Sequence, residues 1–415
     1  MICKKIIKCR ICENRKLKKI INFGNVSLGN NLRKNKKDSI RVKKYPLQLN
    51  QCLNCNHFQL SHSVNPKILY ATNYTYISGV TKTFIKHFVD YSNYMIKKCN
   101  LNKNSLVVDI GSNDGTCLAQ FKKKGIKVCG IDPAKIPSKI ANKNKIYTYN
   151  DFFNEKIKKK ILTKFGPANL VTSHNVLAHV DNLKKVFKLT YSILKPQGYF
   201  CFEIGYFRNV IKNNFFDTIY HEHLDYHHAL PLFKILNKVG FSVLKFDTNE
   251  IQGGTLRVLC IKSKINDLKV VKKFLKDEER FFHYNKSIFF DWKKNIRVNL
   301  VKLKKIIKNK NKKNEFIAGY GAPTKASLLI KIANILKNDI KVIYEDNPYK
   351  VGRYMPNIGI PILSTSQILK DNPTTIIIFA WNFKKEIIKN LRQKIKHKSN
   401  IDIIIPLPKL EIIKL

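Results

Sequence analysis

The densest group of side chains that could perform acid–base chemistry lies in the run FFDTIYHEHLDYHH. Its centre is Tyr220, His221, Glu222 and His223, four ionisable groups in a row. A histidine titrates near neutral pH, so it can take a proton from a carbon that a neighbouring ketone acidifies. A carboxylate could orient the imidazole, and a tyrosine hydroxyl could support an enolate oxygen. The H-E-H order lacks the H-E-x-x-H spacing of a helical zinc site. His179, in NVLAHV, is a further candidate, with a helix-cap or packing role as the alternative.

A loop that could hold a nucleotide-like cofactor lies at VVDIGSNDGT, residues 107–116. The apolar run ends at Asp109, and Gly111 lets the backbone approach a ligand where a side chain would collide. A dinucleotide fold would show G-x-G-x-x-G and a helix start that holds a pyrophosphate. Here the turn contains Asn113 and Asp114 instead, and acidic residues suit a cationic sulfonium better than a diphosphate. We therefore expect S-adenosylmethionine (SAM), with another nucleotide cofactor as the alternative.

Further candidates for binding SAM follow the next three strand-like runs. They are Asp132, Pro133, Asp151, Phe152, His174 and Asn175. The carboxylate of Asp132, 21 residues after Gly111, can take both ribose hydroxyls. The acid and the aromatic ring of the second pair could hold the adenine. Because ligands of such sheets bind at the carboxyl ends of the strands, we expect these residues to share one site.

Two C-x2-C pairs near the N-terminus predict a metal site. The four residues are Cys9, Cys12, Cys52 and Cys55. Each such turn lets two thiolates converge on one metal, and two turns complete a tetrahedral zinc site. Since four sulfur ligands leave no open position for water, we expect the zinc to be structural. Two accidental pairs of free cysteines are the alternative, and the other six cysteines are interpreted as small buried hydrophobes.

The elements that must hold these residues form two alternating series. Short apolar runs alternate with helical patterns from about 101 to 262, and again from EFIAGYG onward. Such alternation predicts an α/β fold with open, mostly parallel sheets. We expect a class I SAM-methyltransferase Rossmann-like sheet, an N-terminal four-cysteine zinc domain and a second, C-terminal Rossmann-like domain. The predicted ranges are 1–65 for the zinc domain, 66–262 for the SAM domain, 263–312 for a helical connector and 313–415 for the C-terminal α/β domain, which we expect to bind a nucleotide sugar.

The composition adds limits on partners and location. Among 415 residues, 78 Lys and Arg stand against 28 Asp and Glu, a formal net charge of +50. The excess is mostly scattered lysine without an RGG run, which favours solvated lysine-rich faces over a nucleic-acid surface. No apolar run reaches the roughly 18–20 residues of a membrane span. The start lacks the pattern of a signal peptide. We expect a cytoplasmic monomer without a specific nucleic-acid partner or membrane contact.

The motifs, in their order, resemble those of the sugar-nucleotide C-methyltransferases, which methylate carbon 3 of a 4-keto-deoxyhexose. The resemblance runs from the zinc domain through DIGSNDGT, GIDPA, NVLAH, YHEH and GGTLRV. It continues into GYGAPTK, EDNPYKVGRYMP and AWNFKKEI, which are the most distinctive part. It implies that a base removes the C-3 proton of an NDP- or TDP-4-keto-deoxyhexose, in deoxysugar biosynthesis. The resulting C-3 carbanion, an enolate of the 4-keto group, would then attack the methyl of SAM.

The same resemblance implies roles for residues of this chain. The base would be His223, supported by Tyr220 and Glu222, with His179 also at the site. A tyrosine after the zinc domain would reach the sugar, either Tyr76 in YTYISG or, two residues earlier, Tyr74.

The nucleoside diphosphate would lie near the glycine turn of the C-terminal domain. The residues expected there are Tyr320, Gly321, Ala322 and Lys325. A glycine turn before a helix, with a lysine beside it, suits a phosphate. A tight strand-to-helix turn without a ligand is the alternative.

Three other functions compete with carbon methylation of a sugar. An O- or N-methyltransferase acting on a nucleotide sugar or other small molecule would use the same cofactor site. A nucleic-acid methyltransferase would show an Asn/Asp-Pro-Pro-aromatic motif, whereas the closest run, DNPYK, lies in the C-terminal series. A non-enzymatic zinc protein would have no use for the SAM loop and YHEH.

Overall fold

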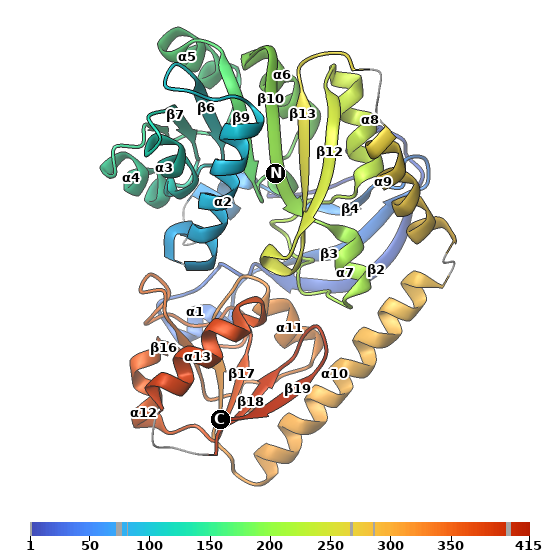
Figure 1. Cartoon of the computed structure of the whole chain (residues 1–415). Coiled ribbons are helices and arrows are strands. Elements are labelled where there is room, and N and C mark those ends of the chain that lie inside the picture. Colours follow the sequence, from blue (N-terminus) through green and yellow to red (C-terminus); the bar gives the residue numbers. More distant parts are fainter. Residues whose placement is uncertain (1, 72–76, 81, 266–268, 285–286, 396–399) are drawn as a thin grey trace. The chain divides into compact units, whose positions relative to one another are not determined.

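The computed structural model forms two compact units (Figure 1). It describes residues 2–71, 77–80, 82–265, 269–284, 287–395 and 400–415. The first unit consists of Met1–Lys18, Asn50–Arg208 and Glu222–Asn285. The second consists of Lys19–Leu49, Asn209–His221 and Lys286–Leu415. Each unit therefore contains chain segments that lie far apart in the sequence.

A seven-stranded sheet is the centre of the first unit. Its order is β12-β13-β10-β9-β6-β7-β8. The strands are β6 (Leu106–Ile110), β7 (Lys127–Ile131), β8 (Thr148–Tyr149), β9 (Ala168–His174), β10 (Leu194–Gly205), β12 (Ser242–Asn249) and β13 (Thr255–Ile261). The five strands from β8 to β10 pair in parallel, and β13 lies antiparallel to both β10 and β12. All five residues of β6 are buried, as expected of a central parallel strand covered on both faces.

Helices cover both faces of this sheet. Figure 1 shows α2 in front of the sheet and α6 behind it. The helices are α2 (Lys82–Lys98), α3 (Thr116–Lys122), α4 (Lys135–Lys143), α5 (Glu155–Phe165), α6 (Leu183–Ile193), α8 (Ala229–Val239) and α9 (Lys269–Glu279). Asn154 and Asn182 cap α5 and α6, because each side chain accepts a hydrogen bond from a backbone N–H of the first turn. The predicted α/β fold class is thus confirmed in this unit.

The paired cysteines lie beside smaller sheets. β1 (Cys3–Lys5) pairs with β5 (His62–Val64). A four-stranded sheet has the order β11-β4-β3-β2, with β2 (Leu17–Ser27), β3 (Lys44–Cys52), β4 (Phe58–Leu60) and β11 (Asp225–Tyr226). The boundary between the units falls within β2 and β3. We call residues 9–12 and 52–60 of the first unit the zinc ribbon.

The second unit is built on a six-stranded sheet of order β16-β15-β14-β17-β18-β19. Its strands are β14 (Ile317–Tyr320), β15 (Val342–Glu345), β16 (Ile362–Ser364), β17 (Thr375–Ile378), β18 (Asp402–Ile405) and β19 (Glu411–Lys414). All pairs are parallel except that of β18 with β19. Its helices are α1 (Lys36–Ile40), α10 (Ile288–Lys312), α11 (Ala326–Ile332), α12 (Ile368–Asp371) and α13 (Lys384–Lys394), and α7 (Phe207–Lys212) spans the boundary between the units. The predicted second Rossmann-like sheet is present.

Part of the N-terminal segment belongs to this second unit. The ammonium of Lys331 donates to the backbone oxygens of Phe23 and Asn25, 2.8 and 2.5 Å away. The backbone N–H of Asn357 donates to Ser39 at 2.6 Å. The compact units therefore divide the chain differently from the four sequence ranges given above, which stay predictions.

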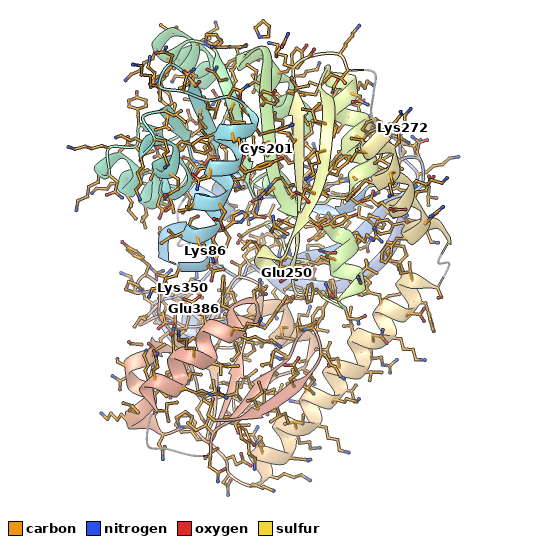
Figure 2. All side chains as sticks on the ribbon, in the orientation of Figure 1. Lys86, Cys201, Glu250, Lys272, Lys350 and Glu386 are labelled. Carbon is orange, nitrogen blue, oxygen red and sulfur yellow. The ribbon has the colours of Figure 1, made fainter. Side chains whose placement is uncertain are left out.

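Four of the six cysteines outside the metal site are buried as predicted, whereas Cys3 and Cys99 are half-buried. Cys201 lies buried in β10, whereas Lys272 on α9 is exposed and points outward (Figure 2). Cys117, Cys129 and Cys260 are also buried, and no disulfide forms among the described cysteines. No helix in the described parts of the chain combines the length and apolar character of a membrane span.

Candidate functional site

The four cysteines of the zinc ribbon converge as a tetrahedral metal site requires. The sulfur of Cys9 lies 3.5 Å from that of Cys55, and the sulfur of Cys12 lies 3.6 Å from that of Cys52. All four sulfur atoms lie within 4.8 Å of one another. Zinc–sulfur bonds of about 2.3 Å place tetrahedral ligands about 3.8 Å apart, so the cluster fits zinc. The N–H groups of Ile11 and Cys12 point at the Cys9 sulfur, at 3.4 and 3.5 Å, and would stabilise a thiolate.

In the loop after β6, Gly111 packs closely against another part of the chain, and its predicted approach to a ligand stays a prediction. Gly111 has a φ of +75°, and its N–H donates to Ile131 at 2.7 Å. A Cβ on Gly111 would lie 2.2 Å from Val176, so only glycine fits. Asp109 is buried, and its Oδ1 finds no hydrogen-bond partner among the described residues. Burial and the nearby Asp132 raise the pKa of Asp109 well above its usual range. A buried acceptor without a partner beside a glycine turn fits a ligand that carries donors.

Asn113 and Asp114 hold the segment before α2. The side-chain oxygen of Asn113 accepts from the N–H of Ser78, and Asp114 accepts from the N–H of Gly79, both at 2.9 Å. A Cβ on Gly79 would lie 2.6 Å from the Asp114 carboxylate. Asp114 also accepts from the backbone and hydroxyl of Thr116, at the start of α3. The serine–glycine pair in YTYISG is the sequence signal for this contact.

Asp132 stands at the end of β7, where the predicted ribose ligand belongs. Its two carboxylate oxygens accept from the N–H groups of Asn113 and Ala134, at 2.9 and 2.8 Å. Burial raises the pKa of Asp132 to about 6, against these two donors, which lower it. Each carboxylate oxygen keeps a second lone pair for a ligand hydroxyl. Pro133 beside it is half-buried.

The remaining SAM candidates lie in two different settings. Phe152 is 38% exposed, and its N–H donates to Asp151 at 2.7 Å, so this pair remains accessible to an adenine ring. Asn175 has a left-handed φ of +56°, and its N–H donates to the backbone of Glu203 at 2.7 Å. His174 is turned into a cluster of charged side chains around Glu203 instead.

That cluster was not predicted from the sequence. One oxygen of the buried Glu203 carboxylate faces His87 Nε2 at 2.6 Å and His174 Nδ1 at 3.1 Å. The other accepts from Arg257 at 2.7 Å and Asn249 at 3.1 Å. Although burial raises it, the hydrogen bonds and charges of the histidines hold the pKa of Glu203 well below its usual range. With a guanidinium on the same carboxylate, hydrogen bonding accounts for the cluster better than a cation does.

The catalytic candidates of the first unit bring two imidazoles together. The ring centres of His179 and His223 lie 4.8 Å apart at an angle of 63°. His179 Nδ1 lies 2.7 Å from the backbone oxygen of Glu222. Since a carbonyl only accepts, this nitrogen carries the proton. Burial lowers the pKa of His179 to about 4, so the ring is neutral at pH 7. His223 is half-buried, and the side chain of Glu222 is buried.

The other predicted catalytic residues lie elsewhere or beyond the described chain. Tyr220 is half-buried. His221 is buried, and its Nε2 donates to the backbone oxygen of Tyr45 at 3.1 Å. Tyr74 and Tyr76 lie outside the described residues. The boundary between the units falls between His221 and Glu222.

In the second unit, the residues predicted to bind the nucleoside diphosphate donate hydrogen bonds to other residues of the chain. The hydroxyl of Tyr320 donates to Asp346 at 2.6 Å, and the N–H of Gly321 donates to Tyr344 at 2.7 Å. The N–H of Ala322 donates to Glu345 at 2.8 Å. These contacts are those of a tight strand-to-helix turn.

Lys325 is buried beside an acid and an aromatic ring. Its ammonium lies 3.6 Å from Asp217, contacts Asn382 and stands 3.5 Å over the centre of the Trp381 ring. Burial lowers the pKa of Lys325 to about 8, against the nearby Asp217, which raises it. The Trp381 indole N–H donates to Asp217 at 2.6 Å. Lys325 therefore belongs to a buried polar cluster.

Comparison with known proteins identifies three domains along the chain. Family models match residues 9–70 as a zinc binding domain, 85–245 as a methyltransferase domain and 250–408 as a C-methyltransferase C-terminal domain. The C-methyltransferase NovU of Streptomyces niveus is 26% identical over 411 residues, covering 99% of this chain and 98% of NovU. This chain is a SAM-dependent C-methyltransferase.

Solved structures resemble part of this C-methyltransferase. Magnesium protoporphyrin IX methyltransferase from Synechocystis PCC 6803 with bound SAM is 15% identical and covers 43% of this chain and 79% of its own, with a TM-score of 0.33. A SAM-dependent methyltransferase from Clostridium acetobutylicum ATCC 824 is 14% identical and covers 43% of this chain and 92% of its own, with a TM-score of 0.35.

The cofactors predicted for the C-methyltransferase are confirmed. SAM follows from the methyltransferase domain, and zinc follows from the zinc binding domain with its four converging cysteines. The roles of individual residues stay predictions.

Proposed function

We propose that the enzyme methylates C-3 of an NDP-4-keto-deoxyhexose, with TDP as the first nucleotide to test. The observation that carries the proposal is the pair of imidazoles His179 and His223, whose ring centres lie 4.8 Å apart. His179 follows β9 in the chain and His223 follows β10, and in the sheet β9 lies between β10 and β6, the strand that precedes Gly111. Carbon methylation needs a base, since a C–H carbon is no nucleophile until it loses its proton. The full-length similarity to NovU, a C-methyltransferase, supports the same chemistry.

In this proposal His223 is the base. Its neighbour His179 is neutral at pH 7 and has its Nδ1 proton committed to the Glu222 backbone. When His223 takes the C-3 proton and becomes positive, it therefore does not face a second positive imidazole. A neutral neighbour keeps the pKa of a base from being lowered by charge repulsion. His179 thus adds no charge repulsion against the protonated form that the reaction creates.

The remaining roles follow from the chemistry of the enolate. Removal of the C-3 proton moves an electron pair onto the C-4 oxygen, and a hydroxyl such as that of Tyr220 or Tyr76 would stabilise this charge. Bound SAM supplies an electrophilic methyl group. Asp109, Gly111, Asn113, Asp114 and Asp132 would hold the cofactor through the loop geometry described above.

The test is NMR spectroscopy of the zinc-loaded enzyme with SAM and a panel of TDP-4-keto-deoxyhexoses in D2O. A new methyl singlet on C-3 is the expected result, and His223→Asn should abolish both methylation and deuterium exchange at C-3. A methyl on oxygen or nitrogen, without exchange at C-3, would replace the proposal with the O- or N-methyltransferase alternative. Methylation that survives His223→Asn would assign the base elsewhere.

A further inference from the structure

A buried acid lies two residues beyond the proposed base. Asp225 begins β11, and its side chain is 0% exposed. The two residues of β11 pair antiparallel with β4 of the zinc ribbon, Asp225 opposite Gln59. The N–H of Leu60 in β4 donates to the backbone of Leu224 at 2.9 Å. The chain that follows His223 is therefore an added strand of the zinc ribbon.

Side chains of the zinc ribbon also form hydrogen bonds with Asp225. Arg10 lies between the zinc ligands Cys9 and Cys12, and its Nε donates to Asp225 Oδ1 at 2.9 Å. His57 Nε2 lies 2.8 Å from the same oxygen. The side chain of Arg10 is 9% exposed and that of His57 is 0% exposed, so water scarcely competes for these contacts. Charge-assisted hydrogen bonds of this kind are strong and directional.

The same guanidinium reaches the segment of the second imidazole. A terminal nitrogen of Arg10 donates to the backbone oxygen of Val180, the residue after His179. The other lies 3.8 Å from the carboxylate of Asp181. The N–H of Leu224 donates to the backbone of Ala178 at 2.7 Å, which links the two segments directly. One planar group therefore touches both chain segments that carry the imidazole pair.

We propose that Arg10 is a positioning residue for the methyl transfer: it fixes the segment of His179 relative to that of His223. Arg10 touches neither imidazole and acts only through Val180 and Asp225. The inference rests on the proposed role of His223 as the base. It gives the zinc ribbon a place in catalysis, because the turn between two zinc ligands sets the direction of the guanidinium.

The fork of the guanidinium is the feature that matters. Lysine at this position would keep the positive charge but could not donate from a planar group to two segments at once. Substitution by methionine would remove the charge and every donor while keeping much of the apolar stem. The two variants therefore separate geometry from charge.

The experiment compares Arg10→Met and Arg10→Lys with a matched control, Lys184→Met. Lys184 on α6 contacts Glu13, the residue that follows Cys12, at 3.4 Å, but this ion pair is solvent-exposed. Zinc content, SAM affinity, kcat, KM and the rate of C-3 deuterium exchange are measured for all three. A displacement of about 1 Å can cost about 100-fold in rate.

The expected result for Arg10→Met is a fall of about 100-fold in kcat and in C-3 exchange, with KM, zinc content and SAM affinity within about threefold of the parent. Arg10→Lys should recover part of the loss, and Lys184→Met should match the parent. An unchanged kcat in Arg10→Met overturns the proposal, as does a loss in KM alone. If Arg10→Met releases zinc, Asp225→Asn provides the test instead, because it leaves the sequence of the zinc ribbon intact. An unchanged kcat in Asp225→Asn overturns the proposal too.

Failure of the proposed substrate is distinguished by a measurement that needs no substrate. The rings of His179 and His223 are close enough for a nuclear Overhauser effect between their ring protons in histidine-labelled enzyme. Arg10→Met should weaken it while Lys184→Met leaves it intact. If the parent enzyme shows the effect but turns over no keto-sugar, the proposed function fails alone. If the effect survives Arg10→Met unchanged, the positioning role fails alone.

Discussion

Replacing Gly111 by alanine should damage the SAM loop in two separable ways. The left-handed φ of +75° costs about 1–2 kcal/mol for a residue with a Cβ. The new Cβ would also lie 2.2 Å from Val176, where ordinary contact begins at 3.4 Å, so something must move by about 1.2 Å. Overpacking of this kind costs about 1–3 kcal/mol. Gly111→Ala should therefore destabilise the first unit by about 2–5 kcal/mol in all.

Gly125 provides the matched control. Its φ of +77° is nearly the same, but a Cβ there would meet nothing within 4 Å. Gly125→Ala should lose only the backbone part, about 1–2 kcal/mol. For both variants, urea unfolding followed by far-UV circular dichroism measures the free energy of unfolding, and calorimetric titration measures SAM affinity. We expect Gly111→Ala to weaken SAM binding at least about tenfold, because the loop must shift where the ligand approaches, and Gly125→Ala to leave SAM affinity unchanged.

A third variant tests the cause of the difference. Val176→Ala removes the two methyl groups nearest the added Cβ, so combining it with Gly111→Ala should recover stability and SAM affinity toward the level of Val176→Ala alone. Equal losses in Gly111→Ala and Gly125→Ala, or strict additivity in the double variant, would refute the steric reasoning and leave only the backbone conformation as the cause.

Three further outcomes are expected. Chelation of zinc, or Cys52→Ser, should melt the zinc ribbon and abolish activity while the seven-stranded sheet still shows SAM-dependent thermal stabilisation; calorimetry with and without SAM checks this. The charged carboxylate of Asp132 is the form that accepts ribose hydroxyls, and its pKa is about 6. SAM affinity should therefore fall as the pH drops through 6, by up to about tenfold at pH 5. SAM titrations from pH 5 to 8 would show a flat profile if Asp132 were not the ligand. Lys325→Met should destabilise the second unit by about 3–5 kcal/mol because it removes the cation beside the buried Asp217. Adding Asp217→Asn should recover part of this loss, because it removes the charge and keeps an oxygen for the Trp381 N–H. A double variant as unstable in urea as Lys325→Met would contradict the pairing.

The central strands were predictable because their signal is local. The apolar runs at 106–110 and 127–131 coincide with β6 and β7, and each is followed directly by glycine or a carboxylate. The glycine turn at Gly111 was predictable for the same reason. Composition, spacing and motif order were enough to indicate both sheets and the four-cysteine cluster.

The direction of single side chains at strand ends was harder to foresee. His174 was predicted to contact SAM because it ends β9. Its side chain instead lies on the same face as that of Thr172, to which it is hydrogen-bonded at 2.9 Å, and there it meets Glu203. Alternation along a strand sets the face, but which face receives the ligand depends on the helices that cover each side.

Contacts between distant segments carried no sequence signal. Arg10 and Asp225 are 215 residues apart, and neither belongs to a motif that names the other. β11 is only two residues long, too short for a periodic pattern. The four donors around Glu203 likewise come from four separate elements. Such polar clusters form only when distant segments pack together, so the pattern of any one segment does not predict them.

The discontinuous second unit has a consequence for how the chain is made. Residues 19–49 belong with residues 286–415, and the bond from Lys331 to Phe23 joins positions 308 residues apart. At roughly 5–20 residues per second, a ribosome needs about 15–60 s between synthesising the first partner and the second. Throughout that interval the nascent chain holds a segment whose permanent neighbours do not yet exist. The first unit also contains a late segment, 222–285, so neither unit can be completed as its N-terminal part emerges. We therefore expect the yield of soluble enzyme to respond to translation rate.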